Sequence, residues 1–193
     1  MIKVKVQSEL WIVLSEDETV CVWEKVDRAF HFNPSINNDI LPFQFTIPVD
    51  VYDISHSPIY NDDEKINEII KSAFIECMGD DAFMYALDWQ HTCFRYNPRI
   101  ETVVEYPVFI PDERYGGGGY NIYFPAFYPN GDYYYLIAKD FRWGYLTHPW
   151  LHKAWVFGDN LMRLFQKYSD EIGYIKTERN RQAVITPGEN HEQ

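Results

Sequence analysis

Cysteines and long apolar runs are scarce in this sequence. Its 193 residues include three cysteines, Cys21, Cys77 and Cys93, and no CxxC pair. This odd number argues against a disulfide framework and predicts reduced thiols. No apolar run approaches the roughly 20 residues that cross a bilayer, and the N-terminus lacks the apolar core and cleavage site of a signal peptide. We therefore expect a cytoplasmic protein that does not enter a membrane.

Basic residues are also few. The chain has 17 Lys and Arg against 29 Asp and Glu, and residues 1–96 hold 7 of the basic and 17 of the acidic ones. Such a field repels nucleic acid and anionic lipid and would attract a basic protein to the N-terminal half. The alternative is that the excess charge only keeps the protein soluble. We expect a monomer or a weak homodimer.

Familiar catalytic and phosphate-binding motifs are missing. The glycines at 116–119 are followed by neither Lys-Ser/Thr nor a helix, so they do not form a phosphate loop. A flexible loop between strands is the simpler interpretation, and a lid over a neighbouring pocket is the functional one. No Gly-x-Ser-x-Gly elbow is present, and the cysteines lie in apolar patterns that do not favour a reactive thiol. Catalytic residues therefore stay unassigned.

Aromatic residues, in contrast, are abundant. The 6 Trp, 15 Tyr and 13 Phe make up 18% of the chain, which favours a sheet-rich protein. These are more aromatic side chains than one sheet face can easily bury, and exposed aromatic clusters mark recognition sites. Core packing remains the competing interpretation for each of them.

Two helices are predicted from apolar spacing and end signals. Residues 16–30 follow Ser15, with a glutamate at capping-box spacing. A strand over residues 20–23 is the alternative, because that run is rich in β-branched residues. Residues 61–79 repeat apolar side chains every three or four positions, begin with acidic residues and stop at Gly79.

Alternating residues predict the first strands. We expect short strands at residues 3–6 and 10–14, and a longer half-buried strand over residues 83–96. In that strand His91 belongs to the apolar face and Asp88 to the opposite face, so the two side chains are not expected to meet.

Prolines and turn residues place the remaining strands. Four prolines exclude a helix between residues 33 and 60 and leave room for a strand around 43–47 or 49–54. Residues 153–157 form a further candidate strand.

A hairpin is predicted around Asn130 and Gly131, which lie between two apolar runs. The turn would place Tyr128 opposite Tyr133. Pro125 would make the first of these strands an edge strand or a bulged one.

A last helix is predicted to begin at Asp159, which can cap it. Residues 176–193 are polar and predict a mobile tail behind a single domain at 1–175. The order of elements indicates an α+β fold, with a mainly antiparallel sheet and two or three helices packed on one face.

Histidines and acids near the aromatic residues supply the candidate site. His148 and His152 are four apart, but Pro149 between them disfavours the helix that would present both to one metal. A shared face in a strand keeps a metal cluster geometrically possible, yet no ligand spacing supports one, so we predict no metal and no cofactor. The candidate binding residues are His91, Asp132, Asp140, Trp143, His148, Trp150 and His152.

Three ordered stretches carry a resemblance. They are "YALDWQHTCFRYNP" at 85–98, "YPNGDYYYLIAKDFRWGYLTHPW" at 128–150 and "WVFGDNLM" at 155–162. They resemble a family of small bacterial proteins known only as a domain of unknown function. The resemblance implies a bacterial origin and supplies no catalytic residues. Thr147 stands where members of the family have Gly before His-Pro-Trp.

Two functions are consistent with these features. The first is a non-enzymatic protein-binding domain, of an immunity or regulatory type, that engages a basic protein through its acidic half. It predicts one exposed acidic patch and buried, singly bonded histidines. The alternative is a small enzyme or ligand-binding domain with a His/Asp pocket gated by Gly116–Gly119. It predicts at least three polar groups that converge in a cleft.

Overall fold

One antiparallel sheet organises the molecule. The computed structural model describes residues 9–33, 43–61, 63–89, 91–101, 108–111, 118–129 and 131–180. Eight of the described strands form this sheet in the order β1-β4-β3-β7-β8-β9-β2-β10, and every pairing is antiparallel. Their bounds are β1 Trp11–Val13, β2 Val49–Asp53, β3 Met84–Asp88, β4 Phe94–Tyr96, β7 Tyr134–Ala138, β8 Gly144–His148, β9 Lys153–Phe157 and β10 Ile175–Asn180. Strands β5 (Val108–Pro111) and β6 (Gly119–Ile122) pair separately.

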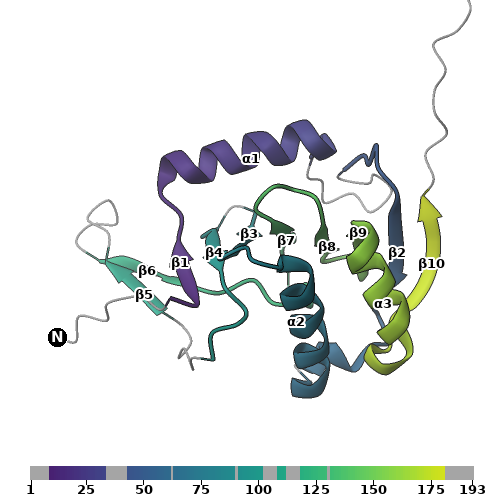
Figure 1. Ribbon diagram of the computed structural model, residues 1–193. Helices are drawn as coiled ribbons and strands as arrows, with labels where there is room; N and C mark the ends of the chain where they lie inside the picture. The colour runs from purple at the N-terminus through teal and green to yellow at the C-terminus, as the bar shows by residue number, and fades with distance from the viewer. Residues whose placement is uncertain are drawn as a thin grey trace, which may run out of the picture.

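Helices cover both faces of the sheet. α2 (Glu64–Met78) and α3 (Asp159–Ile172) pack on one face, and α1 (Glu16–Phe30) packs on the other (Figure 1). A short 3-10 helix, η1 (Pro58–Asn61), precedes α2. The α+β class and the antiparallel sheet are confirmed. Two helices, α2 and α3, pack on one face as expected, and α1 covers the other face in addition.

The buried strands explain why helices are needed on both faces of the sheet. Along β7, Leu136 and Ala138 pack in the cluster under α2 and α3, whereas Tyr135 and Ile137 pack in the cluster under α1. All five residues of β7 are buried. A strand that is apolar on both faces must be covered on both.

Local signals determined the first two helices. Ser15 accepts a hydrogen bond from the Glu18 N–H at 3.2 Å and caps α1, so the alternative strand over residues 20–23 is wrong. Asp63 accepts a hydrogen bond from the Ile66 N–H at 3.1 Å and caps α2 in the same way.

α3 begins at Asp159 as predicted, but its cap differs from the prediction. Its N-cap is Gly158, at φ 89°, and no side chain caps it, so Asp159 is the first helical residue and not the cap. A side chain at position 158 would collide with Trp143 and with the Arg142 carbonyl oxygen. The close approach of the neighbouring chain therefore requires glycine at position 158.

The long strand predicted over residues 83–96 is in fact a hairpin. β3 and β4 pair with each other, with Met84 opposite Tyr96, and β1 pairs with the outer side of β4. The chain turns between Asp88 and Phe94, which reverses its direction and ends the alternation. No glycine or proline lies in this turn, so the sequence carries none of the usual signals for it.

The predicted hairpin around Gly131 is also wrong. β7 pairs with β3 and β8, and residues 123–129 form no strand. Asn130 lies outside the described residues. Pro125 and Pro129 cannot donate to a ladder, so the segment before β7 crosses the molecule as a loop. The hairpins lie further along, where β7 and β8 pair across residues 139–143 and β8 and β9 pair across residues 149–152.

The sheet extends further toward the C-terminus than expected. β10 pairs with β2, so residues 176–180 are an edge strand and not part of a tail. Residues 181–193 and the candidate strand at residues 3–6 lie outside the described residues. Of the two alternatives for the proline-rich region, the strand at β2 is the one that forms.

Candidate functional site

A cleft of about 990 Å³ opens beside the ends of β3 and β7. Its lining residues come from the turn after β3, from the residues that lead into β7, from β1 and β6, and from the first turns of α1. Two exposed apolar side chains, Val20 at 59% and Tyr123 at 56% exposure, are among its lining residues. The cleft thus combines polar groups with apolar walls, as small-molecule sites do.

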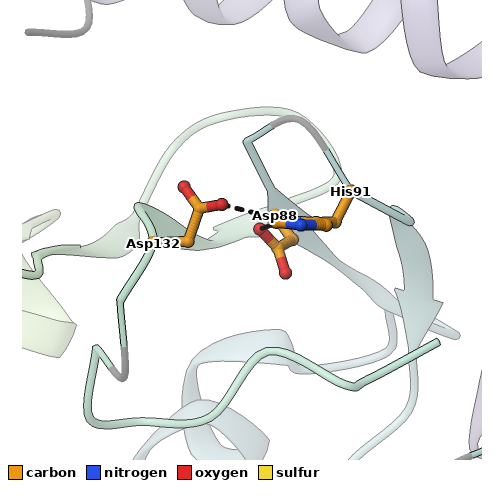
Figure 2. Close-up of side chains that lie close together, drawn as sticks. All are labelled: Asp88, His91 and Asp132. Atoms are coloured by element: carbon orange, nitrogen blue, oxygen red, sulfur yellow. Dashed lines mark hydrogen bonds and ion pairs between the residues drawn. The ribbon is translucent and has the colours of Figure 1, made fainter. Parts of the chain in front are cut away.

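Three polar side chains converge in this cleft. The Nδ1 atom of His91 lies 3.1 Å from Oδ1 of Asp88 and 2.8 Å from Oδ2 of Asp132. Figure 2 shows the two carboxylates and the imidazole directed toward one another. We call these three residues the Asp-His-Asp cluster.

Backbone geometry brings the cluster together. Asp88 ends β3 opposite Tyr134 of β7, so the residues just before Tyr134 pass close to it. The turn after Asp88 folds the chain back, and the N–H of His91 donates to the Asp88 carbonyl oxygen at 3.3 Å. Asp132 accepts a hydrogen bond at Oδ1 from the Tyr133 N–H, 2.7 Å away. This bond holds the carboxylate of Asp132 with its second oxygen toward His91.

Burial and charge shift the protonation of the cluster. The side chain of Asp88 is 5% exposed, and burial together with the charge of Asp132 raises the pKa of Asp88 to about 7. Burial works against protonation of His91, but the hydrogen bonds and charges of both carboxylates outweigh it and raise the pKa of His91. The imidazole is 64% exposed, so the cleft reaches the cluster from its histidine side.

Two of the seven sequence-predicted residues belong to this cluster. His91 and Asp132 come together, and the third member, Asp88, was missed. The alternation over residues 83–96 assigned Asp88 and His91 to opposite faces, which is wrong because the strand ends between them. The stretch Asp-Trp-Gln-His could have indicated the site only if the turn had been recognised.

Asp140 and Trp143 lie elsewhere. Asp140 follows the other end of β7 and accepts a hydrogen bond from Arg142 at 2.7 Å. Arg142 also bonds Asp81, at 2.6 Å. Trp143 is buried, and its Nε1–H donates to the Cys77 carbonyl oxygen at 3.1 Å. These contacts attach the end of α2 to the sheet.

The remaining predicted residues surround the turn between β8 and β9. His148 is fully buried, and its Nδ1 accepts the N–H groups of Trp150 and Leu151, both at 3.3 Å. Burial, with a smaller effect of the charge of His152, lowers the pKa of His148 to about 4, so its ring is neutral and caps the turn. His152 lies 2.8 Å from the Tyr128 hydroxyl through its own Nδ1. Neither histidine belongs to a group of three metal-ligating side chains among the described residues.

Trp150 and the glycine loop are the last of the predicted site features. Trp150 is 41% exposed and packs edge-on against Tyr133 and His148. Gly116 and Gly117 lie outside the described residues. In the segment that follows them, Tyr120 of β6 is the first residue that lines the cleft. The predicted lid over the pocket therefore stays a prediction.

The comparisons with known proteins identify the family. The model of a protein family of unknown function, DUF2716, matches residues 13–162. The chain belongs to this family. The DUF2716 match contains the whole Asp-His-Asp cluster and ends within α3, so β10 lies beyond it.

A bacterial relative is similar to this DUF2716 chain. The uncharacterised protein YxiI of Bacillus subtilis (strain 168) is 29% identical over 161 residues, which cover 79% of this chain and 90% of that protein. No solved structure matches the chain. The expected resemblance to a bacterial family of unknown function is confirmed at the level of the family.

The acidic residues of the DUF2716 chain are divided between two faces. Exposed acids of α1 include Glu16, Asp17, Glu24 and Asp27, whereas those of α2 lie across the sheet from them. The single patch expected for a basic partner is therefore split, and that partner stays a prediction. Within the described ranges, every helix is too short or too polar to span a bilayer.

Proposed function

We propose that this protein binds a small organic molecule in the cleft, with the polar end of that molecule at the Asp-His-Asp cluster. The observation that carries the proposal is the convergence of two carboxylates and one imidazole in the lining of a cleft of about 990 Å³. A pocket with a few convergent polar groups and apolar walls is the usual form of a ligand or active site. This corresponds to the small enzyme or ligand-binding domain among the two functions considered from the sequence.

The lining suggests which molecules would fit. Asp88 and Asp132 offer acceptor oxygens in the lining of the cleft, and Glu16 adds a further acid to it. Val20 and Tyr123 supply apolar surface near the solvent. A ligand with an ammonium or other hydrogen-bond-donating head and an apolar body would satisfy both parts.

A fragment screen tests this proposal. We would record ligand-observed NMR spectra of a fragment library that includes arylalkyl amines, in the presence of EDTA. Fragments with an amine and an aromatic ring are expected to bind. Val20→Trp, which places an indole among the cleft-lining side chains, should abolish their binding.

The control is Lys25→Trp, which adds the same side chain at an exposed position of α1 that does not line the cleft. This variant should bind the same fragments as the natural sequence. If no fragment binds, or if Val20→Trp binds them equally well, the cleft is not a ligand site.

A further inference from the structure

We infer that the Asp-His-Asp cluster, which lines the cleft, is a site for one divalent transition-metal ion. The inference rests on the proposed function, because it concerns the same site: the ion would occupy the two carboxylates in place of an ammonium head. Neither the family nor the relative assigns such a site.

The spacing of the donor atoms fits an ion. The candidate ligand atoms are Asp88 Oδ1, His91 Nδ1 and Asp132 Oδ2, which all lie within 4.8 Å of one another. His91 Nδ1 is 3.1 Å from the first oxygen and 2.8 Å from the second. Adjacent ligands of an octahedral ion with bonds of about 2.1 Å are about 3 Å apart. The two distances from His91 Nδ1 therefore match those between neighbouring ligands, and the two carboxylate oxygens lie within 4.8 Å of each other.

Charge supports the same conclusion. Two carboxylates face a single ring nitrogen, and that nitrogen carries at most one proton, which one of them can accept fully. The Asp88 side chain is only 5% exposed, so water compensates little for the repulsion between the acids. A dication on the three atoms would neutralise both carboxylates at once.

The positions of the ligands are maintained without an ion. Pairing of β3 with β7 holds Asp88, and the Tyr133 N–H holds one oxygen of Asp132 so that the other is directed at His91. Contacts of this kind orient the ligands in metal sites and support their affinity.

The donor set indicates the class of ion. Calcium prefers six to eight oxygen ligands, whereas zinc and manganese accept imidazole together with carboxylates. Three protein ligands leave coordination positions unfilled, and His91 and both acids line the cleft. An ion held in this way can also contact a molecule in the cleft, as in sites with an open position.

Calorimetry on the full chain, freed of metal with EDTA and dialysed, tests the inference. Titration with MnCl₂ and, separately, ZnCl₂ should show one ion per chain. Asp132→Asn should weaken binding at least about 10-fold, as loss of a ligand requires. Asp140→Asn makes the same chemical change beyond the opposite end of β7 and should leave the affinity unchanged.

A spectroscopic measurement keeps the inference testable if Asp132→Asn folds poorly. Electron spin echo modulation of bound Mn²⁺ should report an imidazole nitrogen, and His91→Ala should remove that signal. Lack of saturable binding at one ion per chain, lack of the nitrogen signal, or equal affinity of a folded Asp132→Asn would each overturn the metal site. Fragment binding in EDTA would still stand in that case, so the two proposals can fail independently.

Discussion

Asp88 becomes harder to ionise when the protein folds, and stability should reflect this. Its pKa is about 7 in the folded protein, against an ordinary value near 3.8. The folded state therefore binds more protons than the unfolded state between about pH 4 and pH 7. The free energy of unfolding should fall as the pH rises through that window. The raised pKa of His91 acts in the same direction above pH 6.5.

Replacing Asp88 with asparagine should remove most of this dependence. In urea denaturation with EDTA present, the natural protein should lose about 3 kcal/mol more than Asp88→Asn between pH 5 and pH 8, since each of the two pH units below the Asp88 pKa of about 7 corresponds to about 1.4 kcal/mol. Equal losses in both proteins would show that Asp88 ionises normally in the folded state.

Sequence patterns identified individual site residues better than they predicted which of these residues contact one another. His91 and Asp132 were candidates because histidines and acids near aromatic residues are chemically useful, and that reasoning does not depend on the fold. Asp88 could not be paired with His91, because the pairing depends on a turn without glycine or proline. His148 was a candidate on the same grounds, but its contacts are those of a buried turn cap.

The turn from β9 into α3 depends on Gly158. Alanine there would combine a left-handed backbone at φ 89° with a collision against Trp143 and the Arg142 carbonyl oxygen. We expect Gly158→Ala to lower the free energy of unfolding by more than about 3 kcal/mol. Gly79→Ala is the matched control, because Gly79 also has positive φ, 55°, but nothing lies within 4 Å of an added Cβ. It should cost about 1–2 kcal/mol.

Urea denaturation of both glycine variants makes the comparison. Equal losses would mean that the collision at Gly158 is relieved by small shifts of the neighbouring chain. The backbone conformation alone would then account for the effect.

Helices were more predictable than strand pairing for a physical reason. Capping residues and apolar side chains spaced three or four positions apart act within one segment. α1 and α2 can therefore be predicted from Ser15, Asp63 and the apolar faces of the two helices. β7 pairs with β8, which follows it directly along the chain, and with β3, which lies far earlier, so only one of its two partners is local. A turn signal at Gly131 marks where the chain bends and cannot show which strand lies alongside.

Truncation tests whether β10 is an integral part of the sheet. Lys176 bonds Asp50 at 2.6 Å, and Asp50 is 1% exposed, so a chain ending at residue 174 loses this cation and uncovers the edge of β2. We expect this truncation to lower the free energy of unfolding by about 3 kcal/mol. The shortened chains should also associate with one another through the exposed edge of β2. Thermal unfolding and size-exclusion chromatography measure both effects.

A chain ending at residue 180 is the control for this truncation. It keeps every described contact of β10 and should match the full chain in both measurements. If the chain ending at 174 also matches, then β10 adds nothing to the sheet.

The strand order also bears on how the protein folds during synthesis. β2 lies between β9 and β10, and its partners on both sides are 100 residues or more further along the chain (Figure 1). Closing such long loops costs entropy before any ladder is formed, which slows folding. While a ribosome is still making the last third of the chain, β2 has no partner and its apolar residues stay uncovered. The nascent protein should therefore depend on chaperones until β9 and β10 have emerged.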